Sequence, residues 1–254
     1  MFAFGTQRLL DKGRMQAVCA RAYANGFRIF DTALAYGNQG VLGAALKAIS
    51  AADISVVSKI SPSALAGKGS RTCIDRILAE LQRHRVDTVL IHSPKNVDHV
   101  AAMRYLLGEK DAGRIGKVGV SNYTLRHLEH LAQHGIVPDV LQTEIHPFLQ
   151  ETVLVRHCGA NGIEVMGHTA FAYGRVFNDA PLAEFAAEAG MGVAELVLRW
   201  TAARGIVPVI STTHEDRVPS PCGAPAGLPS LIMERIAALD AGMRICNDPA
   251  WADF

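Results

Sequence analysis

The sequence lacks the features that mark several common classes of protein. No run of apolar residues approaches the roughly 18 that a membrane-spanning helix needs. Neither a GxGxxG dinucleotide fingerprint nor a GxxxxGK[ST] phosphate loop occurs. Charged residues make up only 19%, and 25 Lys and Arg nearly balance 24 Asp and Glu. The resulting net charge of +1 argues against a nucleic-acid partner, which would require clustered basic side chains. We expect no membrane partner either.

Cysteine is scarce, and its five residues are widely separated: Cys19, Cys73, Cys158, Cys222 and Cys246. None belongs to a CxxC pair, and an odd number of scattered cysteines suits free thiols better than a disulfide framework. The first residues show no basic segment followed by a long apolar one, as an export signal would. These observations predict a cytoplasmic protein.

Apolar residues make up 49% of the 254 residues, which is enough for a substantial core. Short apolar runs alternate with segments of helical spacing and predict eight strands: 2–5, 27–32, 54–59, 88–92, 117–121, 140–144, 163–168 and 206–211. Eight such units in about 250 residues predict a single (β/α)8 barrel domain over residues 1–254. A doubly wound sheet is the structural alternative, but its usual fingerprint is absent. Because the first strand starts near residue 2, we expect any N-terminal hairpin to be reduced or absent.

Four polar residues follow the second, third and fourth predicted strands: Asp31, Tyr36, Lys59 and His92. In a barrel the carboxyl ends of the strands meet at one rim, where active sites lie. A lysine ammonium favours the phenolate form of a nearby tyrosine, and a carboxylate keeps that lysine charged. A histidine can donate a hydrogen bond to a carbonyl oxygen. The group therefore suits carbonyl reduction with Tyr36 as the general acid, provided that a cofactor supplies hydride.

Each of these residues also has an ordinary structural interpretation. Asp31 alone is typical of a turn or a helix cap, Tyr36 of a half-buried packing residue, and His92 of a hydrogen-bonded core residue. Lys59 is harder to explain in this way, because an ammonium at the end of an apolar strand needs a partner. Their joint occurrence at three consecutive strand ends favours catalysis.

The chain resembles the aldo-keto reductases in motifs that run through nearly its whole length. The resemblance rests on Asp31-x4-Tyr36-Gly37-Asn38, Lys59, Leu90-Ile-His92, Gly116-Lys-Val-Gly-Val-Ser-Asn122, Leu141-Gln-Thr-Glu-Ile-His-Pro147 and Leu198-Arg-Trp200. It implies that Tyr36 is the acid, that Lys59 and Asp31 tune it, and that His92 orients the carbonyl. It also implies that Ser121, Asn122 and Gln142 hold a nicotinamide carboxamide, and that Thr169 lies near the cofactor pyrophosphate. Members of the family bind NADP(H), less often NAD(H), without a Rossmann domain.

The sequence departs from the family pattern after the seventh and eighth strands. His168 stands where the family stacks a tyrosine on the nicotinamide, and an imidazole titrates near neutrality. Tyr173 is a possible substitute. Ser211, followed by Thr212, replaces the lysine that would meet a 2′-phosphate, whereas Arg217 aligns with the family's arginine. NADP(H) remains favoured over NAD(H), although Arg217 would be one cation at the 2′-phosphate where the family has two. The alternative interpretation of Arg217 is an ion-paired surface residue.

Other polar clusters have plainer interpretations. Ser121 and Asn122 could also cap the helix that begins near Thr124. Glu144 and His146 lack a third ligand with metal-site spacing, so we expect loop structure. His127, His130 and His134 have helical spacing, which predicts a solvated face.

These observations predict an NAD(P)H-dependent reductase of aldehydes or ketones, reversible toward alcohol oxidation. Its partner would be a small carbonyl or alcohol, and the chain would be a monomer or weak oligomer without a metal. The alternatives are a nucleotide-sensing barrel subunit without catalysis, and non-redox carbonyl chemistry, such as an elimination or isomerisation, on the same rim. Ser93 beside His92, and the short segment after Pro94, predict an open pocket for larger substrates.

Overall fold

Eight parallel strands close into a barrel in chain order, with β8 pairing back to β1. The computed structural model describes residues 1–66, 72–220 and 227–249. The strands are β1 (Ala3–Gly5), β2 (Ile29–Asp31), β3 (Ser55–Ile60), β4 (Val86–Ile91), β5 (Ile115–Ser121), β6 (Val140–Glu144), β7 (Glu164–His168) and β8 (Ile206–Ile210). The predicted (β/α)8 barrel is confirmed, and every strand boundary lies within about two residues of its prediction.

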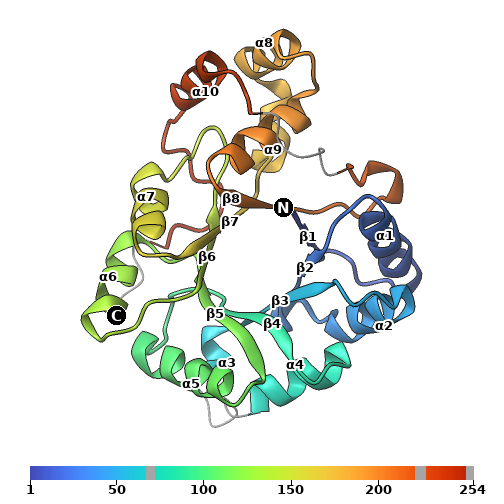
Figure 1. The fold of residues 1–254 in the computed structure, drawn as a ribbon, viewed down its shortest axis with the longest axis vertical. Helices are drawn as coiled ribbons and strands as arrows, with labels where there is room; N and C mark the ends of the chain where they lie inside the picture. The colour runs from blue at the N-terminus through green and yellow to red at the C-terminus, as the bar shows by residue number, and fades with distance from the viewer. Residues whose placement is uncertain (67–71, 221–226, 250–254) are drawn as a thin grey trace.

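The helices form a ring around the barrel (Figure 1). They are α1 (Lys12–Ala24), α2 (Gln39–Ile49), α3 (Pro62–Ala66), α4 (Cys73–Leu81), α5 (His99–Asp111), α6 (Leu125–Gln133), α7 (Thr152–Ala160), α8 (Ala180–Glu188), α9 (Val193–Ala203) and α10 (Ser230–Ala237). Short 3₁₀ helices in the described part of the chain include η1 (Leu34–Tyr36), η3 (Ala172–Asn178) and η4 (Glu215–Arg217). In α4, Ile74, Ile77 and Leu81 lie on one buried stripe, as their spacing requires. No described helix is long and apolar enough to cross a membrane.

Alternation along the strands places the functional residues inside the barrel. A small apolar cluster fills its interior: Ala3, Val57, Leu90, Val140, Met166 and Val209. Side chains two residues apart on a strand point to the same side. The residues two positions after this cluster therefore form the next interior layer, and most of them are polar: Gly5, Lys59, His92, Gln142, His168 and Ser211. The apolar layer is thus a floor on which a polar site is built.

The start of α6 corrects two predictions. Thr124, not Ser121 or Asn122, is the N-cap, and it forms a reciprocal capping box with the His127 side chain. His127 is completely buried and His130 is half-buried, so the predicted solvated face holds only for His134. Helical spacing groups these histidines correctly, but the first turn of α6 is covered by its neighbours.

Candidate active site

One cavity of about 980 Å³ opens at the carboxyl ends of the strands. Every site residue predicted from the sequence lines it: Asp31, Tyr36, Lys59, His92, Ser121, Asn122, Gln142, His168, Thr169, Ser211, Thr212 and Arg217. They come from seven strands, β2 to β8, or the loops that follow them. The residues singled out from the sequence therefore share one cavity, and the geometry of each part indicates what it can do.

A buried ion pair lies at the base of the cavity. Lys59 Nζ is 2.5 Å from Asp31 Oδ1, and both side chains are almost fully buried. Lys59 also donates to the Thr32 carbonyl at 3.1 Å, and Gln142 Nε2 donates to Asp31 Oδ2 at 2.8 Å. Burial disfavours the ammonium, but the negative charge of Asp31 raises the pKa of Lys59 above its ordinary value. Lys59 is therefore a fixed cation, and Asp31 is not a helix cap.

The loop after β2 aims Tyr36 at the cavity. Residues 34–36 form η1, and Gly37 ends it with a φ of 66°, a conformation that glycine adopts without strain. Asn38 is buried and donates from Nδ2 to the carbonyls of Thr6 at 2.7 Å and Leu9 at 3.0 Å. These bonds tie the loop after β2 to the loop after β1, which fixes the position of the tyrosine ring.

Tyr36 and His92 face each other edge to face, with ring centroids 5.6 Å apart. Lys59 Nζ lies 5.3 Å from the centre of the Tyr36 ring. Burial raises the pKa of Tyr36 above its usual value, and the Lys59 charge opposes this rise without reversing it. Burial, together with the charge of Lys59, lowers the pKa of His92 to about 3. Tyr36 is therefore a protonated phenol and His92 a neutral imidazole, each able to donate one hydrogen bond.

The polar groups after β5 and β6 are held in place by one another. Asn122 has a φ of 60° and donates from Nδ2 to the His92 carbonyl at 3.1 Å and to Ser121 Oγ at 3.2 Å. Ser121 is paired with Gln142 in the sheet. Left-handed backbone in a residue other than glycine is often found at ligand-binding positions. Gln142 also donates to Asp31, a contact that the sequence did not predict. The polar groups after β5 and β6 are therefore connected to the Asp31–Lys59 pair.

His168 is held by hydrogen bonds at both ring nitrogens. Its Nε2 is 2.8 Å from Asn122 Oδ1, and its Nδ1 is 2.9 Å from Thr169 Oγ1. Burial lowers the pKa of His168 to about 4, so the expected titration near neutrality is wrong. Thr169 has a φ of 59°, which is strained for a β-branched residue. Tyr173, the suggested substitute, is 66% exposed on the cavity wall.

The segment after β8 forms a partly exposed part of the cavity wall. Ser211 and Arg217 are exposed, and Thr212 Oγ1 accepts from the backbone N–H of His214 at 3.1 Å. Arg217 has no ion pair within the described residues, so the alternative of an ion-paired surface residue is not supported. Its neighbour Glu215 pairs with Arg21 instead, at 3.1 Å. The Arg217 guanidinium is therefore available to an anionic ligand.

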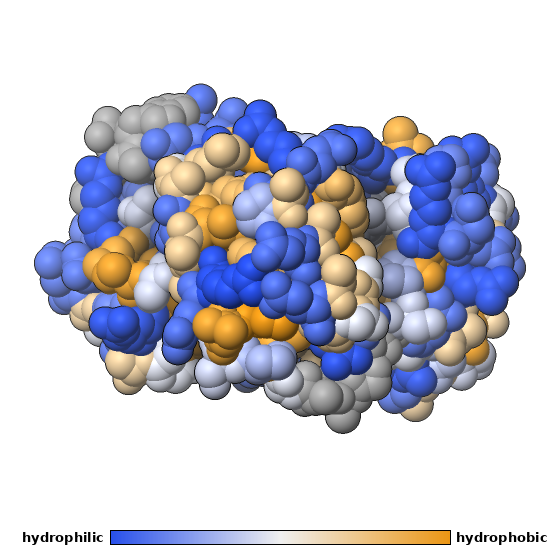
Figure 2. All heavy atoms as spheres, turned by 90° about the horizontal axis from the view of Figure 1, so that it is seen from above, coloured by the Kyte–Doolittle hydropathy of each residue, from blue (hydrophilic) through white to orange (hydrophobic). Residues whose placement is uncertain are grey.

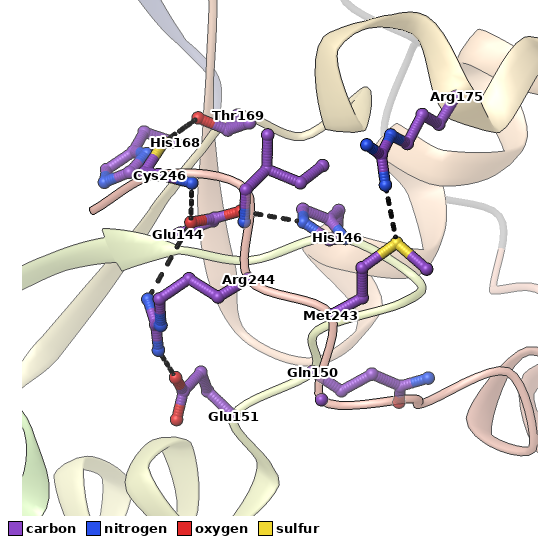
Figure 3. Close-up of polar contacts among 12 residues, drawn as sticks. Glu144, His146, Gln150, Glu151, His168, Thr169, Arg175, Met243, Arg244 and Cys246 are labelled. Carbon is purple, nitrogen blue, oxygen red and sulfur yellow. Dashed lines mark hydrogen bonds and ion pairs between the residues drawn. The ribbon is translucent and has the colours of Figure 1, made fainter. Parts of the chain in front are cut away.

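The sequence missed one wall of the cavity, which is formed by residues 246–249 near the end of the chain. This segment lies against Glu144, which is fully buried and 3.0 Å from His146 Nε2 (Figure 3). No group of three His, Cys, Asp or Glu side chains in the described part of the chain has metal-site geometry. The expected structural role of Glu144 and His146 is consistent with these contacts. In the sequence, the one signal that could have pointed to this wall is the Glu-x-His spacing of Glu144 and His146 before Pro147.

The described residues fit a nicotinamide dinucleotide. The cavity is lined by Tyr36 and His92, by the amides of Asn122 and Gln142, and by the guanidinium of Arg217. Amide groups suit a carboxamide, and an exposed guanidinium suits a phosphate. The volume of about 980 Å³ lies at the upper end of the range for ligand sites.

Comparisons with known proteins all point to one family. The model of the aldo/keto reductase family matches residues 1–239. An uncharacterized oxidoreductase of Bacillus subtilis, YtbE, is 29% identical and covers 100% of this chain and 93% of its own length. The glyoxal reductase of the same organism is 28% identical over 85% of this chain and 80% of its own length.

Two solved structures share the fold. MGS-M4, an aldo-keto reductase from a deep-sea metagenome library, superposes with a TM-score of 0.90 at 23% identity, covering 100% of this chain and 95% of that one. The apo form of Gox0644 also gives a TM-score of 0.90, at 25% identity, with coverage of 100% and 94%. The barrel is therefore the same in all three.

Proposed function

Because the chain belongs to the aldo/keto reductase family, we propose that it is an NAD(P)H-dependent oxidoreductase that reduces an aldehyde or ketone to an alcohol. The reaction is reversible. The observation that carries the proposal is the contact between the buried Asp31–Lys59 pair and Tyr36, with His92 facing the same ring.

Each residue has a role that follows from its protonation state. Neutral His92 donates an N–H to the substrate carbonyl oxygen and orients it. Tyr36 gives its phenolic proton to that oxygen as the carbonyl carbon is reduced. Lys59, held by Asp31, stabilises the phenolate that Tyr36 leaves behind. A nicotinamide cofactor, when bound, supplies the hydride that no side chain can provide.

The cofactor would be held by the same residues that the resemblance implies. Ser121, Asn122 and Gln142 would bind the carboxamide, and the flat ring of His168 would lie against the nicotinamide. Thr169 would lie near the pyrophosphate. Ser211, Thr212 and Arg217 would meet the adenosine phosphates. With Arg217 as the cation at a 2′-phosphate, we propose a preference for NADP(H) over NAD(H).

The first experiment is a calorimetric titration with NADPH and, separately, NADH. Intrinsic fluorescence is a poor substitute, because Trp200 is buried in α9 and does not line the cavity; Trp251 lies outside the described residues. Binding of either would establish the cofactor, and the ratio would measure how far Arg217 favours a 2′-phosphate. Failure of both to bind would contradict the proposal.

The second experiment is Tyr36→Phe, assayed on a broad panel of carbonyl compounds. We expect turnover to fall by at least about 10²-fold, because the general acid is removed, while the cofactor still binds. A wild-type chain that binds the cofactor but turns over no carbonyl compound would indicate the nucleotide-sensing alternative. Substrate conversion without oxidation of the cofactor would indicate non-redox chemistry.

A further inference from the structure

After α10 the chain continues as irregular coil over residues 241–249, a segment that we call the strap. The backbone N–H groups of Ala241 and Met243 both donate to the Phe148 carbonyl, at 3.2 and 2.9 Å. Residues 246–249 then line the catalytic cavity. The strap is thus a wall of the site that is built from coil.

One buried carboxylate holds the middle of the strap. Glu144 Oε1 accepts the N–H of Ile245 at 2.8 Å, and Oε2 accepts the N–H of Cys246 at 2.9 Å (Figure 3). Burial disfavours the charged form, but His146 and these two N–H groups hold the pKa of Glu144 down at about 2. The carboxylate is therefore ionised, and both backbone bonds are charge-assisted, which makes them stronger than neutral ones.

The strap is connected to His168 through hydroxyl and thiol groups. Asn122 donates from Nδ2 to a backbone carbonyl, so its Oδ1 must face His168 as an acceptor. The neutral imidazole then carries its proton on Nε2, and Nδ1 accepts from the Thr169 hydroxyl. The Cys246 sulfur lies 3.5 Å from Thr169 Oγ1. The strap therefore contacts the hydroxyl group that donates to the His168 ring.

We propose that Glu144 is a positioning residue that fastens the strap over the cavity and, through Cys246 and Thr169, fixes the plane of the His168 ring for the cofactor. The inference rests on the proposed function for the identity of the ligand, but not for the fastening itself. Nothing in the roles of Asp31, Lys59, Tyr36 and His92 requires this arrangement.

Loss of the fastening should weaken binding rather than slow the chemistry. A fastened strap presents a preorganised wall, whereas a loose one must be ordered when the ligand binds. We expect the Kd of the cofactor to rise about tenfold, which corresponds to about 1.4 kcal/mol. The kcat should stay within about twofold, because the hydrogen bonds of the Asp31–Lys59 pair go to Thr32 and Gln142 and not to the strap.

The test compares Glu144→Gln with Glu151→Gln. An amide has one oxygen, so its NH₂ group must face at least one of the two backbone N–H groups of the strap. Glu151 also forms an ion pair with Arg244 on the strap, but it accepts no backbone bond from Ile245 or Cys246. Both variants remove one negative charge beside Arg244, but only Glu144→Gln changes the acceptor of the strap N–H groups and the contact with His146.

The direct measurement is amide hydrogen exchange at Ile245 and Cys246 without any cofactor, followed by calorimetric titration with NADPH. We expect faster exchange and a higher Kd in Glu144→Gln, and wild-type behaviour in Glu151→Gln. A folded Glu144→Gln with wild-type exchange and Kd would overturn the inference. So would equal effects of the two variants.

A third variant keeps the inference testable if Glu144→Gln does not fold. Cys246→Ala removes the thiol but leaves the backbone bonds of the strap, so exchange should stay slow while the Kd rises. An unchanged Kd would overturn the link from the strap to His168. A wild-type chain that binds neither NADPH nor NADH would refute the proposed function, whereas the exchange comparison would still decide whether Glu144 fastens the strap.

Discussion

Lys59 has two roles at the residue scale, one structural and one electrostatic. Lys59→Met should reduce turnover by at least about 10²-fold, because the phenolate of Tyr36 loses its nearby cation. It should also destabilise the fold by about 3–5 kcal/mol, because the buried Asp31 carboxylate loses its charged partner. Steady-state kinetics and urea unfolding measure the two effects separately.

A double variant separates these effects further. Lys59→Met combined with Asp31→Asn removes both buried charges and should recover part of the lost stability without recovering turnover. A Lys59→Met protein with unchanged rate and pH profile would remove Lys59 from the mechanism.

The two histidines in the cavity should not appear in the pH profile near neutrality. Burial lowers the pKa of His92 to about 3 and that of His168 to about 4. The pKa of Tyr36 is raised by burial, and the reductive step needs its protonated form. The rate of reduction of a non-ionisable carbonyl should therefore be level from about pH 5 to 9 and fall at higher pH.

The same pKa shifts predict the direction of acid destabilisation. In the unfolded chain both imidazoles take up protons near pH 6.5, whereas in the folded chain they stay neutral to about 3 and 4. Their contribution to the free energy of unfolding is therefore complete above about pH 6.5 and falls as the pH decreases. Circular dichroism at each pH distinguishes unfolding from a catalytic step. An acid limb near pH 6.5 in a fully folded protein would contradict both assignments.

Two glycines test how closely the elements pack. An added Cβ at Gly43 in α2 would lie 2.6 Å from the Glu80 carbonyl of α4, whereas at Gly108 in α5 it would meet nothing within 4 Å. Gly43→Ala should therefore destabilise the protein by about 1–3 kcal/mol. Gly108→Ala should stabilise it by up to about 1 kcal/mol, because alanine favours the helix. Urea unfolding of both variants measures the difference; equal shifts would mean that α2 and α4 do not pack as closely as described.

At the same scale, regular elements were predictable from the sequence and the coil was not. Short apolar runs between segments of helical spacing predicted the strands. Because side chains two residues apart on a strand point to the same side, Lys59, His92 and Gln142 all face the interior of the barrel. The burial of His127 was not predictable, because spacing defines a helical face without saying what covers it. The strap was missed because residues 241–249 have no periodicity, and its position depends on Glu144, about 100 residues earlier in the chain.

The whole molecule combines a rigid barrel with loops that set what can enter. Exposed large apolar side chains are separated along the chain, and Figure 2 shows hydrophilic and hydrophobic residues interspersed on one face. The barrel strands and the short segments directly after them hold the proposed catalytic residues, whereas Ser93, Lys95, Tyr173 and the strap form outer walls of the cavity. On the proposed function, the reacting groups and the outer walls lie on different parts of the fold, and we expect that each can be changed without the other.

The open outer wall predicts activity on large carbonyl compounds. Ser93 lines the cavity directly beside His92, and its side chain leaves space where a bulky residue would fill it. A panel of aldehydes and ketones graded by size should show kcat/KM maintained or rising with size. Ser93→Trp should lower kcat/KM for the largest substrates by at least about tenfold, with little effect on the smallest, because the added ring excludes only the larger ones. Ser93→Ala removes the hydroxyl without adding volume and so separates polarity from size. Efficient turnover of only the smallest aldehydes by the wild-type protein would show that the outer wall closes on its substrate.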